Sequence, residues 1–481
     1  MICISVTPTS RKLAKVDILN ASRHGDLIEV CLDKLVKTPD IGDLIRGFEK
    51  PILISCRRPE DGGHWEGTEE DRLQLLRNAI IAGPAYIELE LDIADTIPPF
   101  GDVKRVVSIN SITRPLGRID DIFERAKNAR ADVVKFTWPT RTLDEAWPLL
   151  AAVSQRRELP VVGMGLGESS VTFSLLGRKF GSPWIYAALE QGMEAHEGQK
   201  TVWDLREAYG WQEVSRKTRF IGVVGMGETE LASTRVMNEA FRKAGADIRC
   251  LPLRLGEMKH VDKMLSTLKV KGLIVGSQDV ESVFPLIEHK HRTVEESGFA
   301  DLVVKRDDVW HGHNTLRTAI VNAIKAAGRD LAKRRVTVVG TTPIAKWLLP
   351  ILTDVGAATS IAAPDDKSSK AMAETYGASF VTWSAMYDTV SEFVILTDPT
   401  IPIGHDHTRD LNPSLLREST TVVDLSRFPE ESKLIEEGRS RGCTVIEPSD
   451  IYVHQLSGQF KALTGKELDA DAFRSGLLGF V

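Results

Sequence analysis

Short apolar runs alternate with longer amphipathic segments, such as TEEDRLQLLRNAI (68–80), along the first half of the chain. Parallel strands need crossover helices, so eight such strand-like runs predict an α/β fold of the (β/α)8 TIM barrel type. In such a barrel the residues at the carboxyl ends of the strands face the active site. The eight runs are ICISVT (2–7), DLIEVCLD (26–33), PILISCR (51–57), YIELELD (86–92), RVVSINS (105–111), VVKFTW (133–138), PVVGMGL (160–166) and SPWIYAAL (182–189).

The pattern changes after the segment TVWDLREAYGWQEVSRKTR (201–219), which we expect to form a last helix and a basic linker. A new domain begins at FIGVVGMGE and continues in further strand–helix units. Within it, RRVTVVGTTPIAKWLLPIL (334–352) runs from apolar residues through a glycine turn into a helix, which predicts a Rossmann-type nucleotide-binding domain. Its loop keeps one glycine of GxGxxG, so Gly340, Thr341 and Thr342 are the candidate cofactor-binding residues.

Composition and charge exclude several classes of protein. The 481 residues, 42% hydrophobic and 27% charged, describe a globular protein of two or three domains. A net charge of −6 without a sustained basic stripe argues against a nucleic-acid partner. No apolar stretch approaches the roughly 20 residues that cross a bilayer, and the first residues lack a signal-peptide pattern, so we expect no membrane partner and a cytoplasmic location. The five cysteines lack CxxC spacing, and we expect no bound metal.

A lysine, Lys135, interrupts the apolar run ADVVKFTWP (131–139). It is either a snorkelling lysine at a strand end or a desolvated amine that attacks a carbonyl to form a Schiff base. Glu29, Arg57 and Asn110 also lie near predicted strand ends. A carboxylate and a guanidinium beside an amine suit an anionic keto substrate, which favours the chemical role.

At these residues the first half, roughly 1–212, resembles type I 3-dehydroquinate dehydratase, a Schiff-base lyase of chorismate and aromatic amino acid biosynthesis. The resemblance implies that Lys135 forms the imine with the ketone of 3-dehydroquinate on the way to 3-dehydroshikimate. It also implies that Arg57 binds the substrate carboxylate region, that Glu29 and Gln199 line the site, and that the barrel needs no cofactor. The motifs that carry it are DLIEVCLDKL, PILISCRRPEDGGHWEG, ADVVKFTWP, MGLGESS, LLGRKFGSPWIYAAL and EGQ.

Several positions depart from this family's pattern. Cys31 stands where the family has an arginine, and Asn110 stands where it has its general acid/base histidine. A later substrate-binding arginine falls near Ser174, and a serine falls on Ala195. An asparagine cannot carry a proton, and loss of a general acid/base commonly costs about 10²- to 10⁴-fold in rate. The imine can therefore form, but its efficient turnover needs another proton carrier.

The second half, roughly 218–481, resembles shikimate dehydrogenase, with a substrate-binding domain over 218–317 and a Rossmann-like domain with C-terminal helices over 318–481. The motifs are IGVVGMGETELASTRVMNEAF, VKGLIVGSQDVESVFPLI, GFADLVVKRDDVWHGHNT and IYVHQLSGQFKALTG. The resemblance places substrate-binding groups at Ser233 and Gln455. The family's catalytic lysine and aspartate fall on Val280 and Leu316, which cannot hold a proton.

The cofactor of this half stays open between NADP, NAD and none. The segment AAPDD offers no arginine for a 2′-phosphate, whereas Asp365 or Asp366 could bond a ribose hydroxyl or could simply form a solvated turn. Two functions remain from these residues. The first is a 3-dehydroquinate dehydratase with a weak or inactive dehydrogenase half. The alternative is a pseudoenzyme that binds shikimate-type metabolites or scaffolds pathway enzymes. In either case the expected partner is 3-dehydroquinate or a related cyclic hydroxy acid, and a homo-oligomer stays open.

Overall fold

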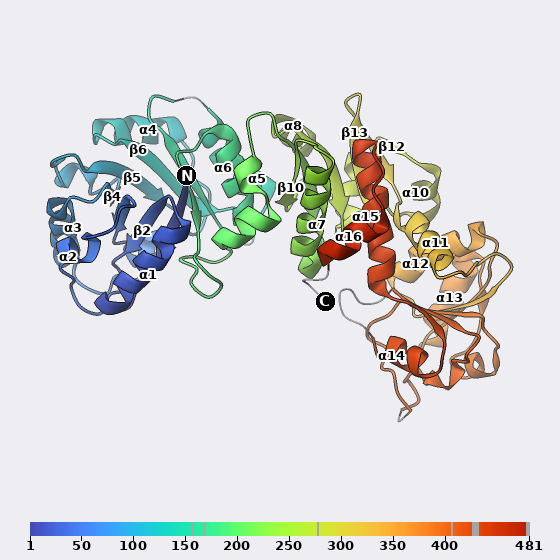
Figure 1. Ribbon diagram of the computed structural model, residues 1–481. Coiled ribbons are helices and arrows are strands. Elements are labelled where there is room, and N and C mark those ends of the chain that lie inside the picture. Colours follow the sequence, from blue (N-terminus) through green and yellow to red (C-terminus); the bar gives the residue numbers. More distant parts are fainter. Residues whose placement is uncertain (156, 168, 277–278, 406, 426–431, 478–481) are drawn as a thin grey trace. The chain divides into compact units, whose positions relative to one another are not determined.

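A computed structural model describes residues 1–155, 157–167, 169–276, 279–405, 407–425 and 432–477 (Figure 1). The chain divides into two compact units, Met1–Gly222 with Asp247–Val270, and Val223–Ala246 with Lys271–Val481. In the described part of the chain, no helix combines the length and apolar character that a membrane span requires.

The first unit contains the predicted eight-stranded parallel barrel, which confirms the expected fold class. The strands are β1 (Ile2–Val6), β2 (Leu27–Cys31), β3 (Ile52–Ser55), β4 (Tyr86–Glu90), β5 (Lys104–Asn110), β6 (Val133–Pro139), β7 (Val161–Leu166) and β8 (Ile185–Ala187). Their order is β7-β6-β5-β4-β3-β2-β1-β8, and the neighbouring pairs with a printed register are parallel. The barrel is nearly closed between β7 and β8, where the Ser182 hydroxyl donates to the carbonyls of Val161 (2.9 Å) and Trp184 (3.0 Å).

Helices follow the strands and cover the outside of the barrel (Figure 1). Three of them begin at side-chain caps, because Ser10 accepts from the Leu13 amide, Asp40 from the Asp43 amide and Thr68 from the Asp71 amide. The expected last helix is short and consists of a π-helical turn at Asp204–Ala208 and a 3₁₀ turn at Trp211–Glu213. The barrel helices are α1 (Arg11–His24), α2 (Ile41–Ile45), α3 (Glu69–Ala82), α4 (Ile119–Asn128), α5 (Leu143–Ser154) and α6 (Ser170–Phe180).

The barrel interior has an apolar layer and a polar layer. Side chains alternate along a strand, so residues two apart face the same side. One buried cluster draws Leu27, Leu53, Val106 and Val133 from four different strands. Two positions further along the same strands stand Glu29, Ser55, Ser108 and Lys135, all of them buried. The outward-facing neighbour of Lys135, Phe136, packs instead against Phe123 of α4, with ring centroids 5.5 Å apart. The period of two therefore carries Lys135 into the barrel.

The rest of the chain forms two further sheets. The first has the order β10-β9-β11-β13-β14-β12, with β13 antiparallel to both β11 and β14. Its elements are β9 (Arg219–Val224), α7 (Glu230–Lys243), β10 (Ile248–Leu253), α8 (Val261–Thr267), β11 (Val270–Val275), α9 (Val280–Val283), β12 (His289–Lys290), α10 (Arg292–Ser297), β13 (Leu302–Arg306) and β14 (Val309–His313).

The last sheet is the predicted Rossmann type. Its strand order, β17-β16-β15-β18-β19-β20, is the 3-2-1-4-5-6 arrangement of doubly wound nucleotide-binding domains, and all its pairs are parallel. Its elements are α11 (Leu316–Ala326), β15 (Arg335–Val339), α12 (Pro343–Asp354), β16 (Ala358–Ala362), α13 (Asp366–Tyr376), β17 (Ser379–Phe380), β18 (Phe393–Leu396), β19 (Thr421–Asp424), α14 (Lys433–Ser440), β20 (Thr444–Ile446), α15 (Pro448–Thr464) and α16 (Ala470–Leu477).

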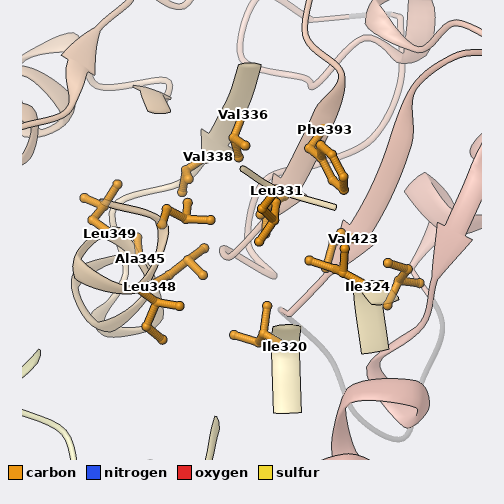
Figure 2. Packing of buried hydrophobic residues seen from close by; sticks show 14 of the residues in the cluster. Ile320, Ile324, Leu331, Val336, Val338, Ala345, Leu348, Leu349, Phe393 and Val423 are labelled. Atoms are coloured by element: carbon orange, nitrogen blue, oxygen red, sulfur yellow. The ribbon is translucent and has the colours of Figure 1, made fainter. Parts of the chain in front are cut away.

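A continuous apolar core holds this Rossmann-type sheet to its helices (Figure 2). Ile320 and Ile324, one turn apart on α11, lie on the side of Val423 of β19, while Leu348 of α12 and Val338 of β15 belong to the same cluster. Burial of each large aliphatic side chain contributes about 1.5–3 kcal/mol, so the fold of this half rests on packing that is independent of any ligand.

Candidate active site

Lys135 lies in the middle of β6 with no solvent exposure. Its Nζ donates to Oε1 and Oε2 of Glu88 on β4, at 3.1 and 2.9 Å. The same ammonium lies 4.8 Å from the ring centroid of Tyr186 on β8, which is a cation–π distance. The lysine that interrupts the apolar run is therefore an interior group with a fixed counter-ion, and the snorkelling interpretation is wrong.

Arg57 joins the two buried carboxylates of the site. Its Nε donates to Glu88 Oε1 at 2.9 Å, and one Nη2 donates both to Glu88 Oε2 at 2.6 Å and to Glu29 Oε1. The hydroxyls of Ser5 and Ser55 also donate to Glu29, at 2.7 and 3.1 Å. The structure thus brings together Lys135, Arg57 and Glu29, which the sequence predicted from separate strands.

The network balances two cations with two carboxylates. Burial by itself raises the pKa of Glu88, but Arg57 and Lys135 outweigh it and hold that pKa at about 2. In Glu29, too, the effect of burial is outweighed by Arg57 and Lys135, and its pKa lies below the ordinary value. Both carboxylates are therefore ionised near neutral pH. Because a buried charge is costly unless paired, the four groups depend on one another.

Polar atoms without partners lie beside this network. Asn110 on β5 donates from Nδ2 to Ser108 at 3.3 Å. Among the residues that the structure describes, its Oδ1 has no hydrogen-bond partner, and neither has Oγ1 of Thr137 nor the hydroxyl of Tyr186. Asn110 and Thr137 are register partners on adjacent strands. Buried polar atoms are normally satisfied, so this group marks the interior as a place for a polar ligand.

Gln199 connects the network to the loop after β8. Its Nε2 donates to the Ser5 hydroxyl at 3.4 Å, and its Oε1 accepts from the Ala195 amide at 2.7 Å. The loop lines a cavity of about 640 Å³ together with residues from the β2, β3 and β7 loops. Its lining residues are Lys34, Gly62, His64, Leu166 and residues 194–200. A second, small cavity is lined in part by Ser174, Tyr186, His196 and Gln199.

Ser233 and Gln455, the predicted substrate-binding residues of the second half, are engaged in structural contacts. The fully buried Ser233 on α7 donates to the Thr229 carbonyl at 2.6 Å and also contacts the hydroxyl of Tyr452 on α15. Gln455 on α15 donates to the buried carboxylate of Asp301 at 2.6 Å. Neither contact leaves the group pointing into a described cavity.

The two positions that would handle a proton in this half are apolar. Val280 is 2% exposed at the start of α9, and Leu316 begins α11 and packs against the core cluster of the Rossmann-type sheet. Each side chain belongs to the packing of its own domain. The local structure agrees with the sequence in offering no acid or base at these two positions.

The backbone of the loop after β15 passes close to Asp398. Gly340 has φ 111°, and a Cβ there would lie 2.6 Å from Cβ of Asp398, so only glycine fits. Thr342 is the N-cap residue of α12, and its hydroxyl donates to the Thr397 carbonyl at 2.9 Å. Pro343, the first residue of the helix, has no backbone N–H.

The fit to a dinucleotide is poor in this loop. A pyrophosphate is bound by free N–H groups at a helix start, and Pro343 removes one of them. Asp365 caps α13 by accepting from the Lys367 amide at 3.1 Å, and Asp366, the first residue of α13, accepts from the Trp383 amide at 2.8 Å, so both carboxylates are engaged in structural contacts. The two aspartates begin α13 instead of forming the solvated turn expected from the sequence, and the residues of this loop do not fit a bound nicotinamide dinucleotide.

Glu88 is the functional residue that the sequence reasoning missed. It lies in YIELELD, where Glu88 and Glu90 occupy alternate positions of a buried strand. Fully buried acids are rare unless paired, and this alternation was the available signal. Its partners Arg57 and Lys135 lie 31 and 47 residues away along the chain, so only the fold reveals the pairing.

Comparison with known proteins identifies the class to which this site belongs. Residues 2–216 match the family model described as type I 3-dehydroquinase. The barrel is therefore a type I 3-dehydroquinase domain, and in this chain it is fused to a shikimate dehydrogenase-like second half.

One relative whose name joins the same two parts is similar to this chain over most of its length. The bifunctional 3-dehydroquinate dehydratase/shikimate dehydrogenase, chloroplastic, of Arabidopsis thaliana is 23% identical over 497 residues, which cover 97% of this chain and 82% of that protein. A solved structure of dehydroquinate dehydratase and shikimate dehydrogenase from S. pombe AroM is 16% identical and covers 99% of this chain and 98% of its own, with a TM-score of 0.48. Quinate dehydrogenase from Corynebacterium glutamicum, solved in complex with NAD, is 18% identical, covers 55% of this chain and 99% of its own, and has a TM-score of 0.49.

Proposed function

We propose that the barrel dehydrates 3-dehydroquinate to 3-dehydroshikimate through an imine on Lys135. The observation that carries the proposal is a fully buried lysine whose counter-ion, Glu88, is itself held by Arg57. We also propose that this activity belongs to a domain over 1–212, followed by a substrate-binding domain over 218–317 and a Rossmann-like domain over 318–481.

Glu88 suits an imine intermediate for a reason of charge. The ammonium of Lys135 and the protonated imine that would replace it each carry one positive charge. Glu88 can therefore serve as counter-ion before and after condensation, and the low pKa that Arg57 and Lys135 give it, about 2, keeps it ionised throughout. The buried network need not reorganise when the covalent bond forms, which is the property expected of a preorganised site.

Arg57 is proposed to bind the anionic end of the substrate with the part of its guanidinium that remains free. Nε and Nη2 are committed to Glu88 and Glu29, whereas Nη1 has no hydrogen-bond partner among the described residues. Glu29 and Gln199 complete the lining, Glu29 by holding Arg57 and Gln199 by closing the loop after β8 onto Ser5.

For the second half we propose that shikimate oxidation is lost. The packing of Val280 and Leu316 and the commitment of Ser233 and Gln455 to structural contacts support this. NAD or NADP would meet a loop whose polar groups are already bonded at Thr342 and at Asp365. This half would then act as a structural or metabolite-binding partner of the barrel.

Borohydride trapping tests the proposed reaction. Purified full-length protein is mixed with 3-dehydroquinate and borohydride, and peptide mass spectrometry locates the reduced adduct. We expect the adduct on Lys135 and, without borohydride, the enone absorbance of 3-dehydroshikimate. Lys179 is the matched internal control, because it is a second buried lysine of the same unit and burial lowers its pKa to about 8.

Each outcome of this experiment has a definite meaning. An adduct on Lys179, or one that persists in Lys135→Ala, would show that simple amine reactivity accounts for trapping and would overturn the proposal. An adduct on Lys135 without enone would favour the alternative function, a protein that binds the metabolite without turnover, which is what Asn110 at the proton-carrying position supports.

A further inference from the structure

A histidine enters the mouth of the barrel from the loop that follows β8. His196 is partly buried, and it lines both the cavity of about 640 Å³ and the smaller cavity beside Tyr186 and Gln199. Three residues further on, Gln199 donates to Ser5, which in turn donates to Glu29 of the charged network. The loop therefore places the imidazole in a cavity that is also lined by Tyr186, whose ring centroid lies 4.8 Å from Nζ of Lys135.

The hydrogen bond of His196 fixes which ring nitrogen can act. Nδ1 lies 3.1 Å from the carbonyl oxygen of Glu197. A carbonyl only accepts, so Nδ1 must carry the hydrogen of the neutral ring and Nε2 must carry the lone pair. Nε2 has no hydrogen-bond partner in the part of the chain that the structure describes. The ring thus presents a bare acceptor, the form needed to take a proton.

The surroundings of His196 favour its neutral form near pH 7. Burial is the main cause, and the charges of Lys135 and Arg57 add to it, so the pKa of His196 falls to about 4 even though the Glu197 carbonyl and Glu29 oppose the shift. The other charged and titratable groups that line its two cavities are Lys34, His64, Glu194, Glu197, Tyr186 and Lys200.

We propose that His196 is the proton carrier of the dehydration, in place of the group that Asn110 cannot supply. This inference rests on the proposed function of the barrel. Nε2 would take a proton from the carbon next to the protonated imine, and the C–H electron pair would form the enamine double bond. The enamine would then expel the β-hydroxyl, which would leave as water with the proton returned by the imidazolium. Hydrolysis of the imine would release the product and restore Lys135.

A second histidine provides a comparison within the same cavity. His64 also lines the cavity of about 640 Å³, but its backbone amide donates to Asp33 at 2.9 Å and its Nδ1 lies 3.6 Å from the same carboxylate. It does not line the smaller cavity beside Tyr186. His64→Gln is therefore the comparison variant for His196→Gln, because it replaces histidine by glutamine at the same mouth of the barrel.

The test combines turnover with trapping in the full-length protein. In His196→Gln we expect the rate of enone formation to fall about 10²- to 10³-fold while borohydride still traps the adduct on Lys135, because imine formation does not need this proton carrier. In His196→Ala, added imidazole should restore part of the lost rate. In the wild type, the rate should fall as pH drops through about 4, where Nε2 becomes protonated, and this limb should be absent from the residual activity of His196→Gln.

The outcomes separate this inference from the function on which it rests. Unchanged turnover in His196→Gln, or a larger loss in His64→Gln, would overturn the role of His196 and leave the dehydratase intact. Loss of the adduct together with turnover in His196→Gln, while Lys135 remains trappable in the wild type, would assign His196 to structure and also overturn the proposal. Absence of both adduct and enone in the wild type would overturn the dehydratase function and the role of His196 together.

Discussion

Both halves of the chain have the fold expected from the sequence, but their polar side chains differ in the groups that they contact. In the barrel, Lys135, Arg57, Glu29 and Glu88 pair with one another. Beside them, Oδ1 of Asn110 and the hydroxyls of Thr137 and Tyr186 have no hydrogen-bond partner among the described residues. In the second half, Ser233, Gln455 and Thr342 hydrogen-bond to structural groups. A polar residue at a family position is therefore weak evidence of function until its partners are known.

The largest expected difference is between two activities of one purified protein. We expect 3-dehydroquinate to be dehydrated, whereas shikimate with NADP or NAD should give no measurable reduced-nicotinamide absorbance, because Val280 and Leu316 cannot hold a proton. Shikimate oxidation within tenfold of about 10 s⁻¹, a median enzyme rate, would show that another residue handles the proton and would remove the contrast between the halves.

Glu88→Gln should weaken the barrel more than any change in the second half. It leaves Arg57 and Lys135 with one counter-ion fewer in a buried site, so we expect a loss of about 3–5 kcal/mol in the free energy of unfolding and little trapping of the adduct. Urea denaturation and borohydride trapping measure the two effects. The matched control is Asp301→Asn, which alters a buried carboxylate of the other half and should leave dehydration unchanged.

The same carboxylate predicts how stability depends on pH. Its ordinary pKa of 4.5 is lowered to about 2 in the folded barrel, so Glu88 stabilises the fold above pH 4.5 and this contribution is lost as pH falls through about 2. The difference amounts to about 3 kcal/mol. Urea denaturation of the wild type and Glu88→Gln between pH 5 and pH 2, roughly the two pKa values, should show the two stabilities converging. Parallel curves would mean that the pKa of Glu88 is the same in the folded and the unfolded state.

The smallest effects are expected from Ser233→Ala and Gln455→Ala. Each removes a buried or partly buried hydrogen bond, and each should lower the free energy of unfolding by about 1–2 kcal/mol without changing the KM or kcat of dehydration. Thermal denaturation and the enone assay measure these quantities. A selective loss of shikimate binding, without loss of stability, would instead identify a ligand site in the second half.

The sequence was sufficient for the architecture and for part of the barrel site. The apolar run ADVVKFTWP predicted a buried strand with Lys135 in its middle, and Glu29 and Arg57 near other strand ends favoured a chemical role for this lysine over a snorkelling one. Glu88 was not predicted as a site residue, because its role depends on ion pairs with Arg57 and Lys135. These partners lie 31 and 47 residues away along the chain, and such long-range pairs leave no local pattern.

The predictions that came from resemblance were less informative about contacts. Ser233 and Gln455 stand at positions that the resemblance assigns to substrate binding. No local pattern indicated that Tyr452 and Asp301 would contact them. His196 does not belong to any motif recognised in the sequence. It became a candidate only when the cavity lining and its bond to the Glu197 carbonyl were known, since both depend on the path of one loop.

The nearly closed seam between β7 and β8 has a consequence for exchange with solvent. The facing strand edges are not joined as neighbours in the sheet order, and the Ser182 hydroxyl bridges them at one end only. Amide hydrogens along this line should exchange with deuterium sooner than those of β2 to β5, which are paired on both sides. Because β8 leads directly into the loop of His196 and Gln199, local opening of the seam would give the barrel a way to admit water and release product without unfolding.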